Sequence, residues 1–212
     1  MPQCRLDASD YVCYSSWVQR QLAFDLPQWG GSRKGAGRPR TQSHPGLIGP
    51  GVPHLKRPAL ASRNPVHVTQ RVQPGVGHLR SWRRSQAIVA ALRSARGLRV
   101  VHYSIQGTHL HSIVEAQNAS ALSRGMQRLA TRLAKRLNAL AGRHGSVFAD
   151  RYSARALTSP REVRDVIRYV LGNSRHHARE RMPRNWEDPL ASGTDAPLSP
   201  PTVWLLRVGW RL

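Results

Sequence analysis

An apolar stripe along residues 119–141 constrains the fold of this chain more than any other feature of its sequence. Its members recur every three or four residues, which is the spacing of one side of an α-helix. Gly142 follows at the position where a helix typically ends. The segment is therefore predicted to be a long helix with one buried side. The stripe consists of Leu122, Met126, Leu129, Leu133, Leu137 and Leu140.

Shorter segments on either side of this helix have the patterns of strands. Residues 66–72 (VHVTQRV) alternate valine with other side chains, and residues 98–106 and 109–116 are two further strand candidates. Only a Gly-Thr pair separates the last two, which predicts a β-hairpin. A helix is predicted over 78–95, and one or two short strands within 145–158.

A last helix is predicted to begin at Ser159, where three signals coincide. Ser159 can cap the helix, Pro160 suits the first helical position, and Glu162 completes a capping box. An apolar stripe follows at helical spacing, so one side of this helix is expected to pack on a sheet. Its members are Val163, Val166, Ile167, Val170 and Leu171.

The predicted order of elements, β-α-β-β-α-β-α, is typical of an α+β domain. We expect a ferredoxin-like antiparallel sheet with the helices packed on one face, built from residues 63–178. Residues 1–62 precede it, and their basic, Gly/Pro-rich part cannot pack a core, so it is expected to be a flexible arm. Residues 179–212 form a tail that contains Trp and Pro residues.

The charge of the chain points to a polyanionic partner. Lys and Arg number 33 against 11 Asp and Glu, which gives a formal net charge of +22. Lys34, Lys56 and Lys135 are the only lysines, and arginine, the more abundant cation here, has the planar fork that fits phosphate oxygens. A GC-rich genome would also favour arginine. Nucleic-acid binding is the function that this charge favours, over the simpler interpretation of a basic protein with arginine-rich codon usage.

Two groups of basic residues are candidates for binding DNA. Arginines recur every four residues along 119–141, although a solvated helix face explains that pattern equally well. In the arm, Arg38 and Arg40 belong to a Gly-Arg-Pro-Arg segment that resembles the centre of an AT-hook. A linker that contacts phosphates without specificity is the other interpretation. The helix group comprises Arg124, Arg128, Arg132, Lys135 and Arg136.

Carboxylates are missing from a long part of the chain, because no Asp or Glu lies between Asp25 and Glu115. A nuclease or polymerase with two metal ions needs several clustered carboxylates to hold them. This distribution argues against such a site. If the chain binds a metal ion, histidine is expected to hold it.

The sequence also bears on the compartment. Cys4 and Cys13 have no partners at zinc-finger spacing, and we interpret them as incidental thiols. No stretch has the roughly 18 to 20 apolar residues that cross a membrane, and acidic residues stand where a signal peptide would be apolar. We expect no membrane partner and a cytoplasmic, nucleoid-associated protein.

Two pairs of polar residues could form a site. His109 and His111 are two apart on a predicted strand, so their imidazoles point to the same side and could bind a metal ion. Tyr169 and Asn173 are four apart on the last helix and share one flank. Each pair also has an ordinary interpretation: two half-exposed histidines, and a tyrosine at the edge of the core.

These motifs together resemble the single-tyrosine HUH transposases, in particular the REP-associated tyrosine transposases. The similarity extends over roughly residues 65–177 and includes, in order, NPVHVTQRV, HYSIQGTHLHSIVE, the arginine-rich helix, FADRY and YVLGN. In that family a histidine pair and a polar residue one turn after the tyrosine bind a divalent metal ion, and the tyrosine is the nucleophile. The resemblance implies metal ligands at His109, His111 and Asn173, and a nucleophile at Tyr169.

The function implied by this resemblance is cleavage and rejoining of single-stranded DNA, with Mg²⁺ or Mn²⁺ as cofactor. Tyr169 would form a 5′-phosphotyrosine intermediate, and the DNA would carry hairpins. The number of subunits, one or two, stays open. Two alternatives remain: a non-catalytic DNA- or RNA-binding protein on the same fold, and a metal-dependent hydrolytic nuclease, against which the lack of carboxylates argues.

Overall fold

The structure is a computed structural model that describes residues 57–177 and 187–212. No helix within these residues is long and apolar enough to cross a membrane. Several of the residues discussed above lie outside the described part of the chain: Arg38 and Arg40 of the basic arm, and the cysteines Cys4 and Cys13.

Four strands form one sheet in the order β2-β3-β1-β4, and every pair of neighbours is antiparallel. The predicted hairpin is confirmed as β2 and β3, and the predicted strand before it as β1. This order, with β1 and β3 in the centre, is that of a ferredoxin-like α+β fold, as expected. The strands are β1 (Val66–Arg71), β2 (Arg99–Ile105), β3 (His109–Glu115) and β4 (Ser153–Ala156).

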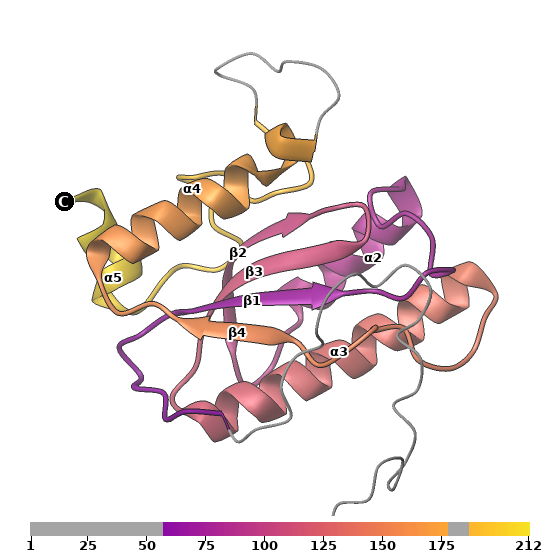
Figure 1. The fold of residues 1–212 in the computed structure, drawn as a ribbon, viewed down its shortest axis with the longest axis horizontal. Helices are drawn as coiled ribbons and strands as arrows, with labels where there is room; N and C mark the ends of the chain where they lie inside the picture. Colours follow the sequence, from indigo (N-terminus) through magenta and orange to yellow (C-terminus); the bar gives the residue numbers. More distant parts are fainter. Residues whose placement is uncertain (1–56, 178–186) are drawn as a thin grey trace, which may run out of the picture. The chain divides into compact units, whose positions relative to one another are not determined.

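Helices cover both faces of the sheet. Figure 1 shows α3 (Ala119–Ala141) on one side of the strands and α4 (Pro160–His177) on the other. The helix α2 (Trp82–Arg93) packs with α3 in the larger of two apolar clusters, whereas α4 belongs to the smaller one. The expectation that all helices lie on one face was wrong, because an apolar stripe shows that one side of a helix is buried but not against which surface.

The alternation of side chains along β3 is as predicted. Leu110 and Val114 pack against α2 and α3, while Ile113 packs against α4. In β2 the pairing with β3 shifts between Val100 and His102, a β-bulge. Because Ile113 packs against α4, the other odd-numbered residues of β3, including both histidines of the HxH motif, lie on the face that α4 covers.

The start of α4 has the predicted cap with one difference. The Glu162 backbone N–H donates to Ser159 Oγ at 3.2 Å, as an N-cap requires. The Glu162 carboxylate, however, accepts from the backbone N–H of Thr158, at 2.8 Å, and from Arg155 at 2.6 Å. The Thr158 backbone bond, together with Arg155 and the Thr158 hydroxyl, lowers the pKa of Glu162 to about 2. The helix thus begins where the sequence indicates, and its acidic cap also holds Arg155 of β4.

The C-terminal residues are packed onto the sheet from position 187 onward. Ile105 N–H donates to the Leu190 carbonyl at 2.9 Å, so this segment covers the edge of β2. Asp188 forms a two-pronged ion pair with Arg80, with both distances 2.8 Å. The predicted boundary between the catalytic domain and the tail, at residue 179, lies outside the described residues and stays a prediction. Two short elements complete the chain, α5 (Trp204–Arg207) and a 3-10 helix (Gly209–Arg211), and both pack near α4.

His102 should make stability depend on pH. Its side chain is 3% exposed, Nδ1 lies 3.0 Å from Ser192 Oγ, and burial lowers its pKa to about 4. The unfolded chain takes up this proton near pH 6.5, so the contribution is complete above 6.5 and is lost as pH falls toward 4. We expect the free energy of unfolding to fall by up to about 3 kcal/mol over that range.

Urea denaturation at several pH values checks this. The variant His102→Asn, which keeps a polar group near Ser192, should lose most of the pH dependence. A smaller part should remain from His67, whose pKa is also lowered by burial and by Arg155. The exposed His144 provides the control, since His144→Asn should leave the profile as in the wild type.

Candidate active site

The predicted histidine pair lies at the beginning of β3, on the face that α4 covers. The rings of His109 and His111 are 4.8 Å apart between centroids and nearly perpendicular. His111 is buried, whereas His109 is partly exposed. The two imidazoles thus lie together where the strand enters the sheet, as the spacing predicted.

The helix α4 brings the predicted tyrosine to this pair. The ring centroid of Tyr169 lies 5.4 Å from that of His111, edge to face, and the residue remains 44% exposed. Asn173, one turn further along α4, is buried, and its side-chain Nδ2 has no hydrogen-bond partner. An amide nitrogen can only donate hydrogen bonds, so this N–H group suits an acceptor such as a phosphate oxygen, whereas a metal ion would need the amide oxygen. Three side chains of the predicted site therefore share one region, and the fourth lies one helical turn away.

A third histidine completes the cluster, and the sequence analysis missed it. His67 of β1 stacks on His111, and its Nε2 lies 3.2 Å from His111 Nδ1. Thr69 Oγ1 lies 3.1 Å from the same nitrogen. Burial first, and then the nearby charge of Arg155, lowers the pKa of His67, so its ring is neutral near pH 7. The alternation in VHVTQRV indicates that the side chain of His67 points to the face of the strand away from the valines. That His67 lies beside His111 follows only from the pairing of β1 with β3.

A basic residue, Arg155, borders the site. Arg155 of β4 is paired in register with His67 of β1, and it lies 2.6 Å from Glu162 in an ion pair on the exposed surface. An exposed pair of this kind contributes little to stability. Its effect here is to hold a guanidinium group beside the histidines, where it favours anionic groups such as phosphate.

Other tyrosines in the described part of the chain are less suited to act as nucleophile. Tyr103 is buried in the cluster under α2 and α3, on the other face of the sheet, and burial raises the pKa of its hydroxyl. Tyr152 stacks with Arg57, whose guanidinium carbon lies 3.8 Å from the ring centroid, and its hydroxyl is buried. Of these three, Tyr169 is the one beside the histidines.

The basic residues of the helix group that was predicted to bind DNA lie along α3, on the face of the sheet opposite Tyr169 (Figure 1). Two of them join α3 to the helix α2: Arg132 donates to Ser94 Oγ at 2.7 Å, and Arg136 to the Ala87 carbonyl at 3.3 Å. Arg124 donates to Ser120 Oγ within its own helix, at 2.6 Å. These residues do not line the histidine cluster, and a role in DNA binding stays a prediction for Arg124, Arg128, Arg132, Lys135 and Arg136.

A divalent metal ion at this site would need mixed donors. Within 57–177 and 187–212, no three His, Cys, Asp or Glu side chains are grouped so that they could hold a metal ion. A ligand set would therefore need the amide of Asn173 beside the imidazoles of His109 and His111. Because Nδ1 of His111 lies close to Thr69 and His67, the role of ligand falls to its Nε2.

Comparison with known proteins gives similarity at the level of structure. No protein-family model and no curated protein sequence matches the chain. Among solved structures, that of a REP-associated tyrosine transposase bound to a REP hairpin aligns with a TM-score of 0.51 and 12% sequence identity. The match covers 66% of this chain and 82% of that one. The chain shares the fold of that transposase.

A second solved structure, a putative transposase from Deinococcus radiodurans, aligns with a TM-score of 0.39 and 14% identity over 58% of this chain and 95% of that one. At 12% identity, the similarity to the first of these structures concerns the fold. What the side chains of this chain do has to be argued from their own geometry.

Proposed function

We propose that this chain is a metal-dependent enzyme that cuts and rejoins single-stranded DNA, with Tyr169 as nucleophile. The observation that carries the proposal is the contact of the Tyr169 ring with the His111 ring, 5.4 Å between centroids, on a partly exposed face of the domain. A protein that only binds nucleic acid has no need for this arrangement. A tyrosine beside imidazoles and a buried amide has a use in phosphoryl transfer.

The reaction follows from the chemistry of a phenol. A tyrosine hydroxyl has a pKa near 10, so it attacks slowly unless its surroundings favour the phenolate or stabilise the phosphate. Tyr169 Oη would form a bond to the phosphorus, and the bond from phosphorus to the 3′ oxygen would break. The phenolic proton would leave to solvent, and the 3′ oxygen would take up a proton to become a hydroxyl. The phosphodiester is conserved as a 5′-phosphotyrosine, so that a second 3′-hydroxyl can reverse the step without ATP.

The remaining residues would hold and orient these groups. When bound by His109, His111 and Asn173, Mg²⁺ or Mn²⁺ would polarise the scissile phosphate. Two imidazoles are softer donors than Mg²⁺ usually selects, so Mn²⁺ should support activity better in vitro. Arg155 would offset part of the phosphate charge from the neighbouring strand.

The proposed substrate is single-stranded DNA that carries a hairpin. Two facts support it: the net charge of +22, and the REP hairpin bound by the structurally similar transposase. Neither gives the base sequence of the target.

A covalent adduct tests the proposal. Purified protein would be incubated with end-labelled, hairpin-bearing single strands and Mn²⁺, and then denatured in SDS. We expect label on the 3′ fragment to migrate with the protein, because the 5′ phosphate of that fragment is joined to tyrosine. Hydrolysis without an adduct would point instead to a nuclease, and binding without cleavage to a non-catalytic protein.

His67 should strengthen metal binding although it is not expected to be a ligand. Its Nε2, 3.2 Å from His111 Nδ1, would keep the His111 proton on Nδ1 and so leave Nε2 for the ion. We expect His67→Ala to weaken Mn²⁺ binding about 10-fold to 100-fold, the range found for such outer partners. Calorimetric titration with Mn²⁺ in the absence of DNA measures this. The exposed His144→Ala should bind Mn²⁺ like the wild type, and equal affinity in both variants would contradict the role given to His67.

A further inference from the structure

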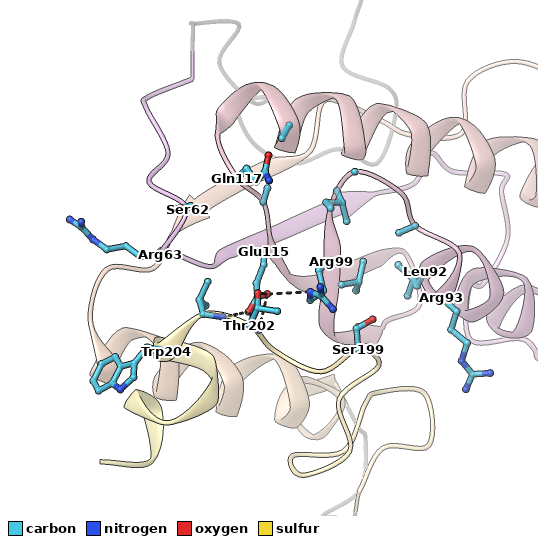
Figure 2. Close-up of a pocket in the computed structure, with 17 residues that line it drawn as sticks. Ser62, Arg63, Leu92, Arg93, Arg99, Glu115, Gln117, Ser199, Thr202 and Trp204 are labelled. Atoms are coloured by element: carbon cyan, nitrogen blue, oxygen red, sulfur yellow. Dashed lines mark hydrogen bonds and ion pairs between the residues drawn. The ribbon is translucent and has the colours of Figure 1, made fainter.

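A cavity of about 830 Å³ lies at the other end of the sheet from the histidine cluster. Its walls come from the end of α2, the beginning of β2, the end of β3, the beginning of α3 and the C-terminal segment (Figure 2). Six positions along β3 separate His109 from Glu115 in its wall, which corresponds to about 20 Å. The cavity is thus distinct from the candidate active site, and its volume is in the range that suits a small organic ligand or one nucleotide.

The rim of the cavity is basic. Arg63 and Arg93 stand on different sides of the mouth, and their side chains extend away from its centre (Figure 2). Neither forms an ion pair with a carboxylate among residues 57–177 and 187–212. Two unpaired guanidinium groups at the mouth would meet the phosphates of a strand that crosses it.

Glu115 is the one carboxylate in the wall, and its hydrogen bonds are already made within the protein. Its oxygens accept the backbone N–H groups of Thr202 and Val203 at 2.9 and 3.0 Å, and the Thr202 hydroxyl as well. Arg99 Nε lies 3.5 Å away. These contacts offset the carboxylate charge, so it repels an anion less. They also fix the C-terminal segment to the end of β3, directly before Trp204.

Trp204 supplies a flat apolar surface at the mouth. It is 56% exposed, and its ring lies against the backbone of Gly209: a Cβ added at Gly209 would be only 2.6 Å from Cζ3 of the indole. The ring is therefore supported on one side and open to solvent elsewhere. Leu92 and Leu98 contribute apolar surface to the cavity wall. An exposed aromatic ring beside basic side chains is the combination on which single-stranded nucleic acids stack their bases.

We propose that this cavity binds a nucleotide of single-stranded nucleic acid. Its base stacks on Trp204, and phosphates further along the strand contact Arg63 on one side of the mouth and Arg93 on the other. The inference rests on the proposed function in one respect: the strand that is held here is the one cut at Tyr169. It adds a second contact about 20 Å from the reacting phosphate, which would position the strand without taking part in the chemistry.

Binding of a fluorescein-labelled oligothymidylate to the full chain, in EDTA, tests the cavity without requiring cleavage. Trp204→Ala should weaken binding about tenfold, since stacking of one base is worth about 1 to 3 kcal/mol, and Trp204→Phe should restore most of it. The matched control is Trp82→Ala. Trp82 is more exposed, at 76%, and it does not line the cavity, so affinity should stay as in the wild type. Equal losses at Trp82 and Trp204, or no loss at Trp204, would overturn the proposal.

The arginines give a second, independent measurement. Arg63→Gln and Arg93→Gln should each reduce the slope of log K against log salt by about 0.7 in magnitude, the value for one phosphate contact of a single strand. An unchanged slope in both variants would overturn the phosphate contacts, and a protein or small molecule would then be the better occupant. Failure here is distinguishable from failure of the proposed function. If wild-type protein forms no adduct but Trp204→Ala still loses oligothymidylate affinity, only the proposed function fails. If wild-type protein forms the adduct but Trp204→Ala keeps full affinity for oligothymidylate, only the cavity proposal fails.

Discussion

Tyr169→Phe is expected to remove the covalent protein–DNA adduct completely, while folding and DNA affinity stay as in the wild type. The ring keeps its edge contacts with His111 and His67, at 5.4 and 6.0 Å between centroids, so that the packing of α4 is conserved. Only the hydroxyl is lost, and without it no bond to phosphorus can form. The measurement is label that survives SDS denaturation, combined with a thermal melt and an anisotropy titration on the same preparation.

Two further tyrosines serve as controls for that experiment. Tyr103→Phe and Tyr152→Phe should both keep the adduct, because Tyr103 lies on the other face of the sheet and Tyr152 is stacked with Arg57. An adduct that persists in Tyr169→Phe would contradict the assignment. The nucleophile would then be sought first at these two positions, and next at Tyr11 and Tyr14, which lie outside the described residues.

Short-range patterns were sufficient to predict the strands and the longer helices of this fold, but not α5 or the final 3-10 helix. The helix α3 begins and ends where its apolar stripe does, and Gly142 adopts the left-handed conformation, with φ 59°, that closes it. Leu140, the last member of the stripe, is 40% exposed and not buried as predicted. The alternation in β3 correctly separated Leu110 and Val114 from Ile113. Both signals depend on residues a few positions apart, which is why a single sequence contains them.

Long-range pairing was not predictable in the same way. His67 lies beside His111 because β1 pairs with β3 so that Thr69 stands opposite His111. Nothing within VHVTQRV indicates that register. The valines of this segment therefore predicted a strand, while no role was assigned to its histidine. The position of α4 on the second face of the sheet was not predictable for the same reason, because it depends on the connection after β4 and not on the pattern within the helix.

The cavity near Trp204 could not be predicted from the sequence for a related reason. The segment that forms one wall is held by main-chain groups, such as the Thr202 and Val203 N–H groups that donate to Glu115. Backbone donors are present at almost every residue, so they leave no pattern in a sequence. In this region the sequence shows only a tryptophan after a Pro-rich stretch. The position of this tryptophan relative to Arg63 and Arg93 is seen only in the folded chain.

The largest effect after loss of the tyrosine is expected from the histidine pair. His109→Ala should reduce cleavage and adduct formation to the level found with EDTA, because one of two imidazole donors is removed and no cluster of carboxylates lies within the described residues to replace it. DNA affinity should remain, since we assign it to arginines. His109 is the better position for this test than the buried His111, because a partly exposed side chain can be shortened with less damage to the core.

His111→Ala should have the same effect on cleavage, accompanied by a lower melting temperature, because the Nδ1 contacts with Thr69 and His67 are lost as well. Asn173→Ala should be milder, as an amide oxygen is a weaker ligand than an imidazole. The measurements are adduct yield at increasing Mn²⁺ and Mn²⁺ affinity by calorimetry. If His109 and His111 are ligands, both quantities fall together in each histidine variant, and excess Mn²⁺ restores part of the yield in Asn173→Ala. Cleavage at the wild-type level in His109→Ala and in His111→Ala would leave Tyr169 without the metal site proposed for it, and the phosphate would then have to be stabilised by Arg155 alone.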